Sequence, residues 1–192
     1  MTDTWLGAPT LEYGTVVLRP LALGDAEELG GLVGDPEVFR WSPGVPANVD
    51  EARTFVETAL RAREAGQRTA FAVIDNGRLV GSTSYYAINP ADLGVAIGHT
   101  FYTESAQGTR VNPTSKFLLL RHAFEDCGAV RVEWHTNEHN ARSRAAIAKL
   151  GAQFEGLMRK HKRFGDGWRT TALYAMTDDD WPAAKAALLN RI

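Results

Sequence analysis

The stretch NARSRAAIAKLGAQFEG, residues 140–156, contains the signals that decide how the second half of the chain folds. Asn140 is a favoured N-cap residue, and the alanine-rich run after it has high helix propensity. Gly151 suits the position just after a helix, because glycine readily adopts the left-handed backbone conformation found there. The stretch therefore predicts a helix over residues 141–150 and a strand that starts at Gln153.

Regular elements are expected on both sides of this stretch. Two strands should flank Asn76-Gly77, which is a strong signal for a tight hairpin. A helix is expected where apolar residues recur at helical spacing after Pro113. The expected strands are 15–21, 69–75, 78–88, 93–102, 129–136, 153–164 and 168–176, and the expected helices are 26–34, 48–65, 113–127, 141–150 and one that Asp178 opens. Residues 1–13 are expected to be a loose lead-in.

The order of these elements is β-α-α-β-β-β-α-β-α-β-β-α. It predicts one α/β (α+β) domain over residues 1–192, with its core at about 15–177. The sheet should be mixed and twisted, with about seven strands and helices on both faces. Strands 93–102 and 129–136 should form a central parallel pair, because a helix crossover is the usual link between parallel strands.

The composition excludes several classes of protein. The 192 residues are 44% hydrophobic and 23% charged, which is typical of a globular domain. The net charge of −2 disfavours nucleic acid as a partner, and no apolar run is long enough to span a membrane. A single cysteine, Cys127, excludes an intrachain disulfide and a cysteine-rich metal site. The N-terminus lacks the pattern of a signal peptide, so a soluble, cytoplasmic protein without a metal is expected.

One expected helix start is basic where acidic residues are usual. Asn112 should cap a helix that begins at Pro113, after the loop QGTRV. Arg110 and Lys116 would oppose the helix dipole there, unless an anion binds to the helix start. An ordinary helix start with solvated cations is the alternative.

A second basic helix start follows at residues 138–144 (EHNARSR), with Asn140 as its cap and Ser143 in its first turn. Both helix starts come after neighbouring strands of the expected sheet. They should therefore face one crevice at the carboxyl ends of the strands, which is the usual ligand position in open sheets.

These features resemble the Gcn5-related N-acetyltransferase (GNAT) superfamily over about residues 15–177. The branch that the chain most resembles is the RimJ/RimL type, which acts on ribosomal-protein N-termini. The resemblance rests on QGTRVN before a helix, on the late segment RKH…GDGWR, and on the pattern N-x-x-S…K-L-G-x-x-x-E-G. The residues of that pattern are Asn140, Ser143, Lys149, Leu150, Gly151, Glu155 and Gly156.

The resemblance implies acetyl-CoA as cofactor, held in a V between two splayed parallel strands, here 93–102 and 129–136. It places the pyrophosphate on the amides of the loop before Pro113 and the pantetheine along the end of the first strand. The residues implied to bind the cofactor are Thr100, Phe101, Tyr102, Gln107, Gly108, Thr109, Arg110, Val111, Asn112, Lys116, Asn140, Ser143 and Lys149. Homodimers are common among similar proteins, and the sequence leaves the oligomeric state open.

The chain departs from the family pattern at four positions. Arg110 and Asn112 stand where the family's phosphate-binding loop has small residues. This indicates a variant loop that still has the backbone amides with which the family binds the pyrophosphate. Ile147 replaces a tyrosine often found seven residues after the asparagine, so a tyrosine general acid is absent. Ala96 replaces a glutamate that often serves as general base.

Acetyl transfer to an amine needs a neutral amine, stabilisation of an oxyanion and a leaving thiolate. A free backbone N–H at the end of strand 93–102 could stabilise the oxyanion by donating a hydrogen bond to it. Ser143 is the expected proton donor to the leaving sulfur. His99 and Glu104 are candidate bases, and so are Glu133 and His135, which share a face of the next strand. Glu133 and Trp41 are also expected near the acceptor amine. For each of these residues a purely structural role is the competing interpretation, and a base acting through water is a further one.

The expected function is acetyl-CoA-dependent N-acetylation of a primary amine, with a protein or peptide N-terminus as the favoured acceptor. An α-amine has a reference pKa of about 7.7–8.0 against about 10.4 for lysine, so it loses its proton more easily. Two alternatives stay open at this point. One is acetylation of a small amine such as an amino-sugar, polyamine or antibiotic, and the other is a CoA-binding regulatory module without transfer activity.

Overall fold

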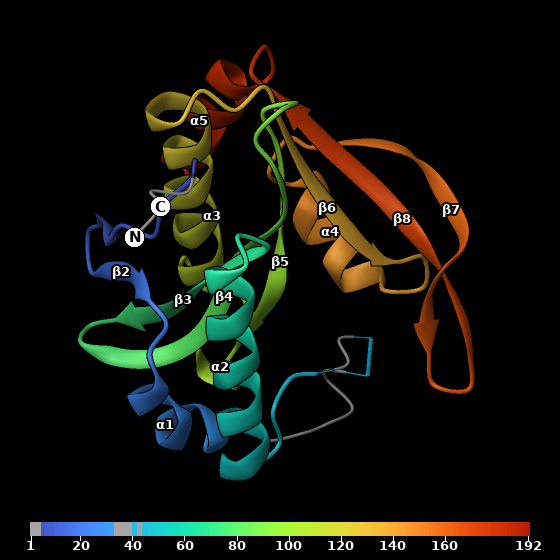
Figure 1. The fold of residues 1–192 in the computed structure, drawn as a ribbon. Coiled ribbons are helices and arrows are strands. Elements are labelled where there is room, and N and C mark those ends of the chain that lie inside the picture. Colours follow the sequence, from blue (N-terminus) through green and yellow to red (C-terminus); the bar gives the residue numbers. More distant parts are fainter. Residues whose placement is uncertain (1–4, 33–39, 42–43) are drawn as a thin grey trace.

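Eight strands form one sheet in the computed structural model, which describes residues 5–32, 40–41 and 44–192 (Figure 1). Their order is β1-β2-β3-β4-β5-β6-β8-β7, and only β5 and β6 run parallel to each other. The strands are β1 (Leu11–Tyr13), β2 (Val16–Pro20), β3 (Arg68–Asp75), β4 (Arg78–Asn89), β5 (Gly94–Tyr102), β6 (Arg131–Asn137), β7 (Gln153–Phe164) and β8 (Gly167–Thr177). The predicted mixed sheet with a central parallel pair is confirmed.

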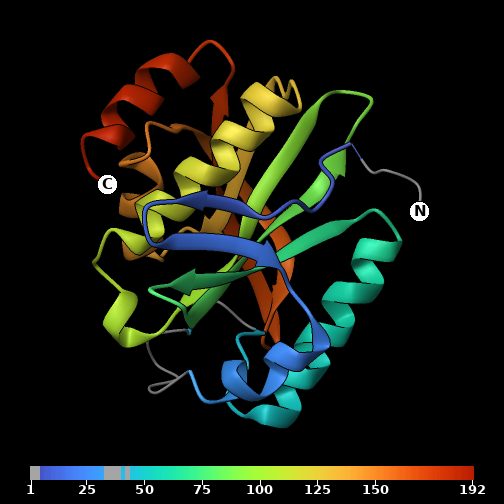
Figure 2. The same cartoon turned by 90° about the vertical axis from the view of Figure 1, so that its left-hand side faces the viewer.

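Helices cover both faces of this sheet (Figures 1 and 2). One face carries α1 (Ala26–Gly30) and α2 (Val49–Glu64), whose apolar side chains form a smaller core with β3 and β4. The other face carries α3 (Val111–Arg121), α4 (Ala141–Ala148) and α5 (Trp181–Leu189), which share a larger core with the sheet. The two faces are called the α2 face and the α3 face below. Among the described residues, none of the helices combines the length and apolar character that a membrane span requires.

Several predicted boundaries need correction. Residues 11–13 lie in a part of the chain expected to be a loose lead-in, but they form β1, which pairs antiparallel with β2. The helix expected at 113–127 begins at Val111 with Arg110 as N-cap, so Asn112 does not cap it. Proline is tolerated anywhere in a first helical turn, where its missing N–H has no intrahelical acceptor, and so Pro113 did not fix the first residue. The last turn of the expected helix, His122–Asp126, is a π-helix.

A β-bulge interrupts β5 beside β4. Ser82 pairs with Phe101 and Ser84 pairs with Gly98, so one residue of β4 faces two residues of β5. His99, one of those two, has a φ of +48°, which is unusual for a residue with a side chain. Gly98 must lack a side chain, because a Cβ there would lie 2.6 Å from Tyr86 Cε1. The Tyr86 ring therefore passes across β5 on the α2 face.

The central parallel pair is short and then opens. Residues 94–96 of β5 pair with residues 131–133 of β6, and no further pairing joins the two strands. Each strand keeps its antiparallel partner on the outer side, β4 for β5 and β8 for β6, up to its carboxyl end. The facing edges of β5 and β6 consequently diverge as a V, as Figure 1 shows, and the predicted splayed pair is confirmed.

Candidate active site

The two predicted helix starts lie at the open end of the V. The N-terminus of α3 follows the carboxyl end of β5, and the N-terminus of α4 follows the carboxyl end of β6. A hydrogen bond links them directly, since Arg142 Nη1 in α4 donates to Gln107 Oε1 at 2.8 Å. Asn140 caps α4 as predicted, with its Oδ1 accepting from the backbone N–H of Ser143 at 3.0 Å.

The loop before α3 has the features of an anion cradle. Gly108 has a φ of +73°, and a Cβ built on it would meet no atom within 4 Å. Among the described residues, no acceptor is found for the backbone N–H groups of Gly108, Thr109 and Arg110. These amides stand immediately before the positive end of α3. An open loop with unpaired amides fits the pyrophosphate of a coenzyme A molecule.

Two cations that were expected to strengthen this cradle are engaged elsewhere. Arg110 Nη2 lies 3.0 Å from Asp75 Oδ1, so its charge is already balanced by β3. Lys116 is 5% exposed, and its Nζ donates at 2.8 Å to the hydroxyls of Thr83 and Thr100 beneath the sheet. The prediction that Lys116 adds exposed positive charge to the loop is therefore wrong.

The last residues of β5 place their backbone along the open V. Thr100 is turned toward Lys116 on the α3 face, whereas Phe101 packs on the α2 face with its ring 5.6 Å from that of Phe55. The ladder with β6 has ended by this point, so the inner backbone edge of residues 100–102 faces the V without a strand partner. This edge can pair with an extended ligand such as pantetheine. Below it, Gln107 Nε2 donates to the Tyr102 carbonyl at 3.1 Å and fixes the loop to the strand.

A chain of charged side chains runs along β6. Arg131 hydrogen-bonds Glu155 of β7 on one side and Glu133 on the other, where its Nε donates at 2.7 Å. His135 Nε2 lies 2.9 Å from the second oxygen of Glu133. The hydrogen bonds from His135 and Arg131 lower the pKa of Glu133 to about 2, so this carboxylate is ionised. Because a carboxylate only accepts, Nε2 of His135 carries the hydrogen of this bond, and in the neutral ring the lone pair is on Nδ1.

His135 was one of several base candidates in the sequence, and the structure distinguishes it by the state of its second ring nitrogen. Its Nδ1 is buried and has no hydrogen-bond partner among the described residues. The His135 ring contacts the rings of Tyr86 at 5.9 Å and His161 at 5.7 Å. In the neutral ring this nitrogen carries the lone pair, which makes His135 a candidate proton acceptor beside the V. The signal available in the sequence was the alternation of Glu133 and His135 on one face of a strand.

The other residues that the sequence predicted for the site lie on several different elements. His99 is exposed at the bulge in β5, and desolvation together with the charges of Arg68 and Lys162 lowers its pKa to about 4. Glu104 is exposed in a short 3-10 helix after β5. Trp41 stacks on Phe164 of the β7–β8 hairpin, with ring centroids 5.9 Å apart. Lys149 lies at the far end of α4, roughly 13–14 Å along the axis from Asn140, and is not brought to the helix starts.

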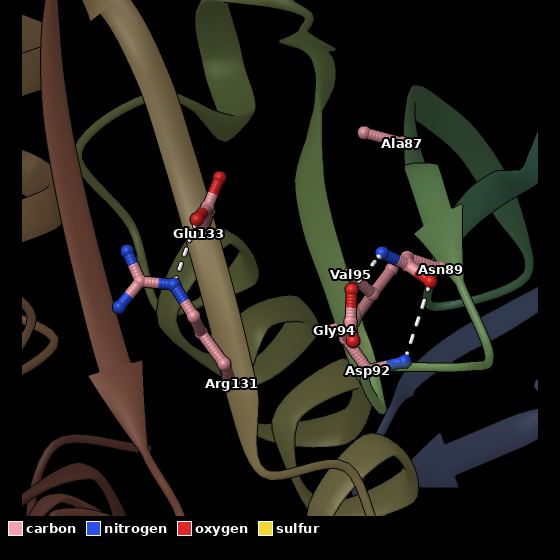
Figure 3. Close-up of a pocket in the computed structure, with 7 residues that line it drawn as sticks. All are labelled: Ala87, Asn89, Asp92, Gly94, Val95, Arg131 and Glu133. Carbon is pink, nitrogen blue, oxygen red and sulfur yellow. Dashed lines mark hydrogen bonds and ion pairs between the residues drawn. The ribbon is translucent and has the colours of Figure 1, made fainter.

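A cavity of about 250 Å³ lies at the closed end of the V, where β5 and β6 are still paired (Figure 3). Its lining residues are Ala87, Asn89, Asp92, Gly94, Val95, Arg131 and Glu133. The Arg131–Glu133 pair thus continues from this cavity toward His135. Within the described ranges, no group of three or more histidine, cysteine, aspartate or glutamate side chains could hold a metal ion.

Comparison with known proteins agrees with this geometry. Residues 15–153 match the family model described as acetyltransferase (GNAT) domain. The chain belongs to the GNAT acetyltransferase family. Members use acetyl-CoA to acetylate an amine, and N-acetyltransferase activity is therefore assigned to this protein.

Individual relatives extend the match over most of the chain. Bacillus subtilis (strain 168) YjcK, described as a probable N-acetyltransferase, is 24% identical over 88% of this chain and 98% of its own. The crystal structure of a GCN5-related N-acetyltransferase from Brucella melitensis is 27% identical, with a TM-score of 0.88 over 95% of this chain and 85% of that one. RimL, a ribosomal L7/L12 alpha-N-protein acetyltransferase, shares the fold at 20% identity, with a TM-score of 0.80 over 89% and 95% of the two chains. RimL has also been solved in complex with coenzyme A.

Proposed function

We propose that this GNAT enzyme acetylates the α-amine of a protein or peptide N-terminus. The observation that carries the proposal is the Glu133–His135 pair, in which an ionised carboxylate holds a histidine whose Nδ1 is unbonded within the described ranges. An α-amine is partly neutral near pH 7–8, so a weak base is enough to remove its proton. The resemblance to the fold of RimL, which is named for acetylation of an α-amine, supports the same acceptor class.

The proposed roles follow from where the side chains lie. Acetyl-CoA, when bound, supplies an acetyl thioester that a neutral amine can attack. The amides of Gly108, Thr109 and Arg110 would hold its pyrophosphate, and Thr100, Phe101 and Tyr102 would offer backbone groups to its pantetheine. His135 would accept the proton of the incoming amine while Glu133 keeps the ring oriented. Ser143, beside the capped start of α4, would donate a proton to the leaving sulfur.

A panel of acceptors tests this proposal. Thiol release from acetyl-CoA should be measured with a peptide bearing a free α-amine and no lysine, and with the same peptide blocked at its N-terminus and extended by a lysine. A polyamine and an amino-sugar complete the panel. We expect turnover on the free α-amine and little on the blocked peptide. Turnover on the polyamine or amino-sugar alone would instead favour a small-amine acetyltransferase.

A further inference from the structure

Three basic side chains surround Tyr86 and His99 on the α2 face of the sheet. They are Arg68 of β3, Lys162 of β7 and Arg169 of β8. Across the part of the chain that the structure describes, none of the three forms an ion pair with a carboxylate. Three cations without counter-ions at one place are notable in a chain whose net charge is −2.

Arg68 forms the inner end of this group. The residue is 8% exposed, and its guanidinium lies over the Phe55 ring, with Cζ 4.8 Å from the ring centroid. Its Nε donates to Ser84 Oγ at 3.0 Å, but its Nη2 is buried and finds no hydrogen-bond partner in the described part of the chain. Burial lowers the pKa of Arg68 to about 10, so the group still carries its charge at neutral pH. A buried charge without a partner is costly, and an anion would relieve that cost.

Lys162 and Arg169 form the outer part of the group. Lys162 Nζ lies 5.7 Å from the centroid of the Tyr86 ring, and Arg169 Nε donates to Thr171 Oγ1 at 3.0 Å. Burial and the neighbouring charge of Arg169 lower the pKa of Lys162. Lys162 is nevertheless exposed to solvent, so a ligand can reach it.

The neighbouring titratable groups do not cancel this positive charge. His99 is neutral at physiological pH, since its pKa is lowered to about 4. Burial also lowers the pKa of His161, which contacts His135. Glu133 is the acidic group that acts on Tyr86, and its carboxylate is already bound by Arg131 and His135. The wall around Tyr86 is therefore net positive and next to the proposed base.

We infer that this wall binds an anionic group of the acceptor, and that the preferred acceptors are amines carrying a carboxylate close to the reacting nitrogen. The inference rests on the proposed function, in which the acceptor is a protein or peptide N-terminus. The preferred N-termini would then have an aspartate or glutamate as their second residue. The rings of His135 and Tyr86 are 5.9 Å apart, and Lys162 Nζ lies 5.7 Å from the same Tyr86 ring. Base and cation are thus separated by no more than about three residues of extended peptide, at ~3.5 Å each.

The test compares kcat/KM for three peptides that differ only at the second residue, which is aspartate, asparagine or lysine. We expect kcat/KM to be about tenfold higher for the aspartate peptide than for the lysine peptide, because the carboxylate can form charge-assisted hydrogen bonds with the basic side chains. This ratio should fall as salt is added, because salt screens the charges. Lys162→Gln should reduce that preference to about threefold, and Lys162→Gln with Arg169→Gln should abolish it. Arg159→Gln removes the same charge from an exposed position on the same strand and should leave the preference intact.

Equal or reversed preference in the unmodified enzyme would overturn the inference, as would an aspartate preference that survives the double substitution. Two small amines separate this outcome from failure of the proposed function. If glutamate is acetylated faster than putrescine while no peptide is used, the acceptor class is wrong but the anion preference stands. If peptides are acetylated without regard to the charge of the second residue, the proposed function stands and the inference fails.

Discussion

Arg110 Nη2 lies 3.0 Å from Asp75 Oδ1, and this ion pair joins the loop before α3 to the end of β3. Arg110 also donates to Thr15 Oγ1 at 2.6 Å, so its guanidinium has two partners in the protein. The backbone N–H of the same residue is one of the unpaired amides of the proposed pyrophosphate cradle. The residue thus contributes to the site through its main chain, while its side chain serves the connection between loop and sheet.

Arg110→Gln should consequently change the KM for acetyl-CoA by less than about threefold, because the lost charge is already neutralised by Asp75 and is partly exposed. Steady-state kinetics with acetyl-CoA as the varied substrate measure this. A KM raised more than tenfold would show that Arg110 leaves Asp75 and binds phosphate in the complex.

Gly108→Val should raise the KM for acetyl-CoA by about tenfold. The site has space for a side chain, but the φ of +73° is strained for a β-branched residue and the loop amides would be displaced. Gly128→Val is a matched control, since Gly128 has a φ of +67°, also with no atom within 4 Å of a Cβ, and it lies beyond the other end of the helical segment that follows the loop. An unchanged KM in Gly108→Val, with a stable fold, would remove the cradle from the proposal.

The cradle and the V illustrate what the sequence could predict. Asn140 and Gly151 are local signals near the two ends of one short helix. Asn140 accepts a hydrogen bond from a backbone N–H three residues on, and Gly151 adopts a positive φ of +96° after the last turn. The order of strands and helices was enough to place β5 beside β6, and with them the two helix starts that Arg142 joins to Gln107. These features depend on contacts near in sequence or on chain topology.

The orientation of Lys116 could not be predicted in the same way. Lys116 is the sixth residue of α3, and this helix packs against the sheet, including β1 and β2, and against α5. A helix surrounded by other elements offers no solvated face to a lysine, and that burial is set by parts of the chain far away in sequence. The bulge at His99 was missed for a similar reason, because a positive φ at a residue with a side chain has no local signal.

Lys116→Met should stabilise the protein at neutral pH. Burial lowers the pKa of Lys116 from 10.5 to about 7, so the unfolded chain binds one proton more than the folded chain between these pH values. Stability of the unmodified protein should therefore rise with pH across that window, whereas below pH 7 the full cost of burying the charge is present. Methionine removes this cost and leaves Thr83 and Thr100 bonded to each other at 2.8 Å.

Urea unfolding at pH 6 and pH 9 measures this effect. The gain in unfolding free energy should be about 1–3 kcal/mol at pH 6 and smaller at pH 9. A gain that is equal at both pH values would mean that packing, and not the charge of Lys116, sets the difference.

Glu133→Gln should lower kcat by about 10- to 100-fold, with a smaller effect on the KM for acetyl-CoA. The amide cannot stabilise a protonated His135, and its NH₂ group can reverse the hydrogen bond so that Nδ1 no longer has the lone pair. Glu155→Gln is the control, because it removes a carboxylate from the same chain of charges without touching His135. Equal loss in both variants would show that the network is structural and that the base lies elsewhere.

Ser143→Ala should lower kcat while barely moving the affinity for acetyl-CoA, because a proton donor to the leaving sulfur acts mainly in the transition state. We expect a loss of about 10- to 100-fold, below the upper range of acid–base catalysis, since a thiol with a pKa near 8.5 already leaves fairly well as a thiolate.

Asn140→Ala separates this role from a structural one. Asn140 caps α4 through the backbone N–H of Ser143, so its loss should cost about 1 kcal/mol of stability and weaken cofactor binding together. The Ser143 variant keeps that backbone N–H and its cap, so it should show neither effect. If Ser143→Ala retains full kcat on a good acceptor, the serine is only a residue of the first helical turn and water supplies the proton.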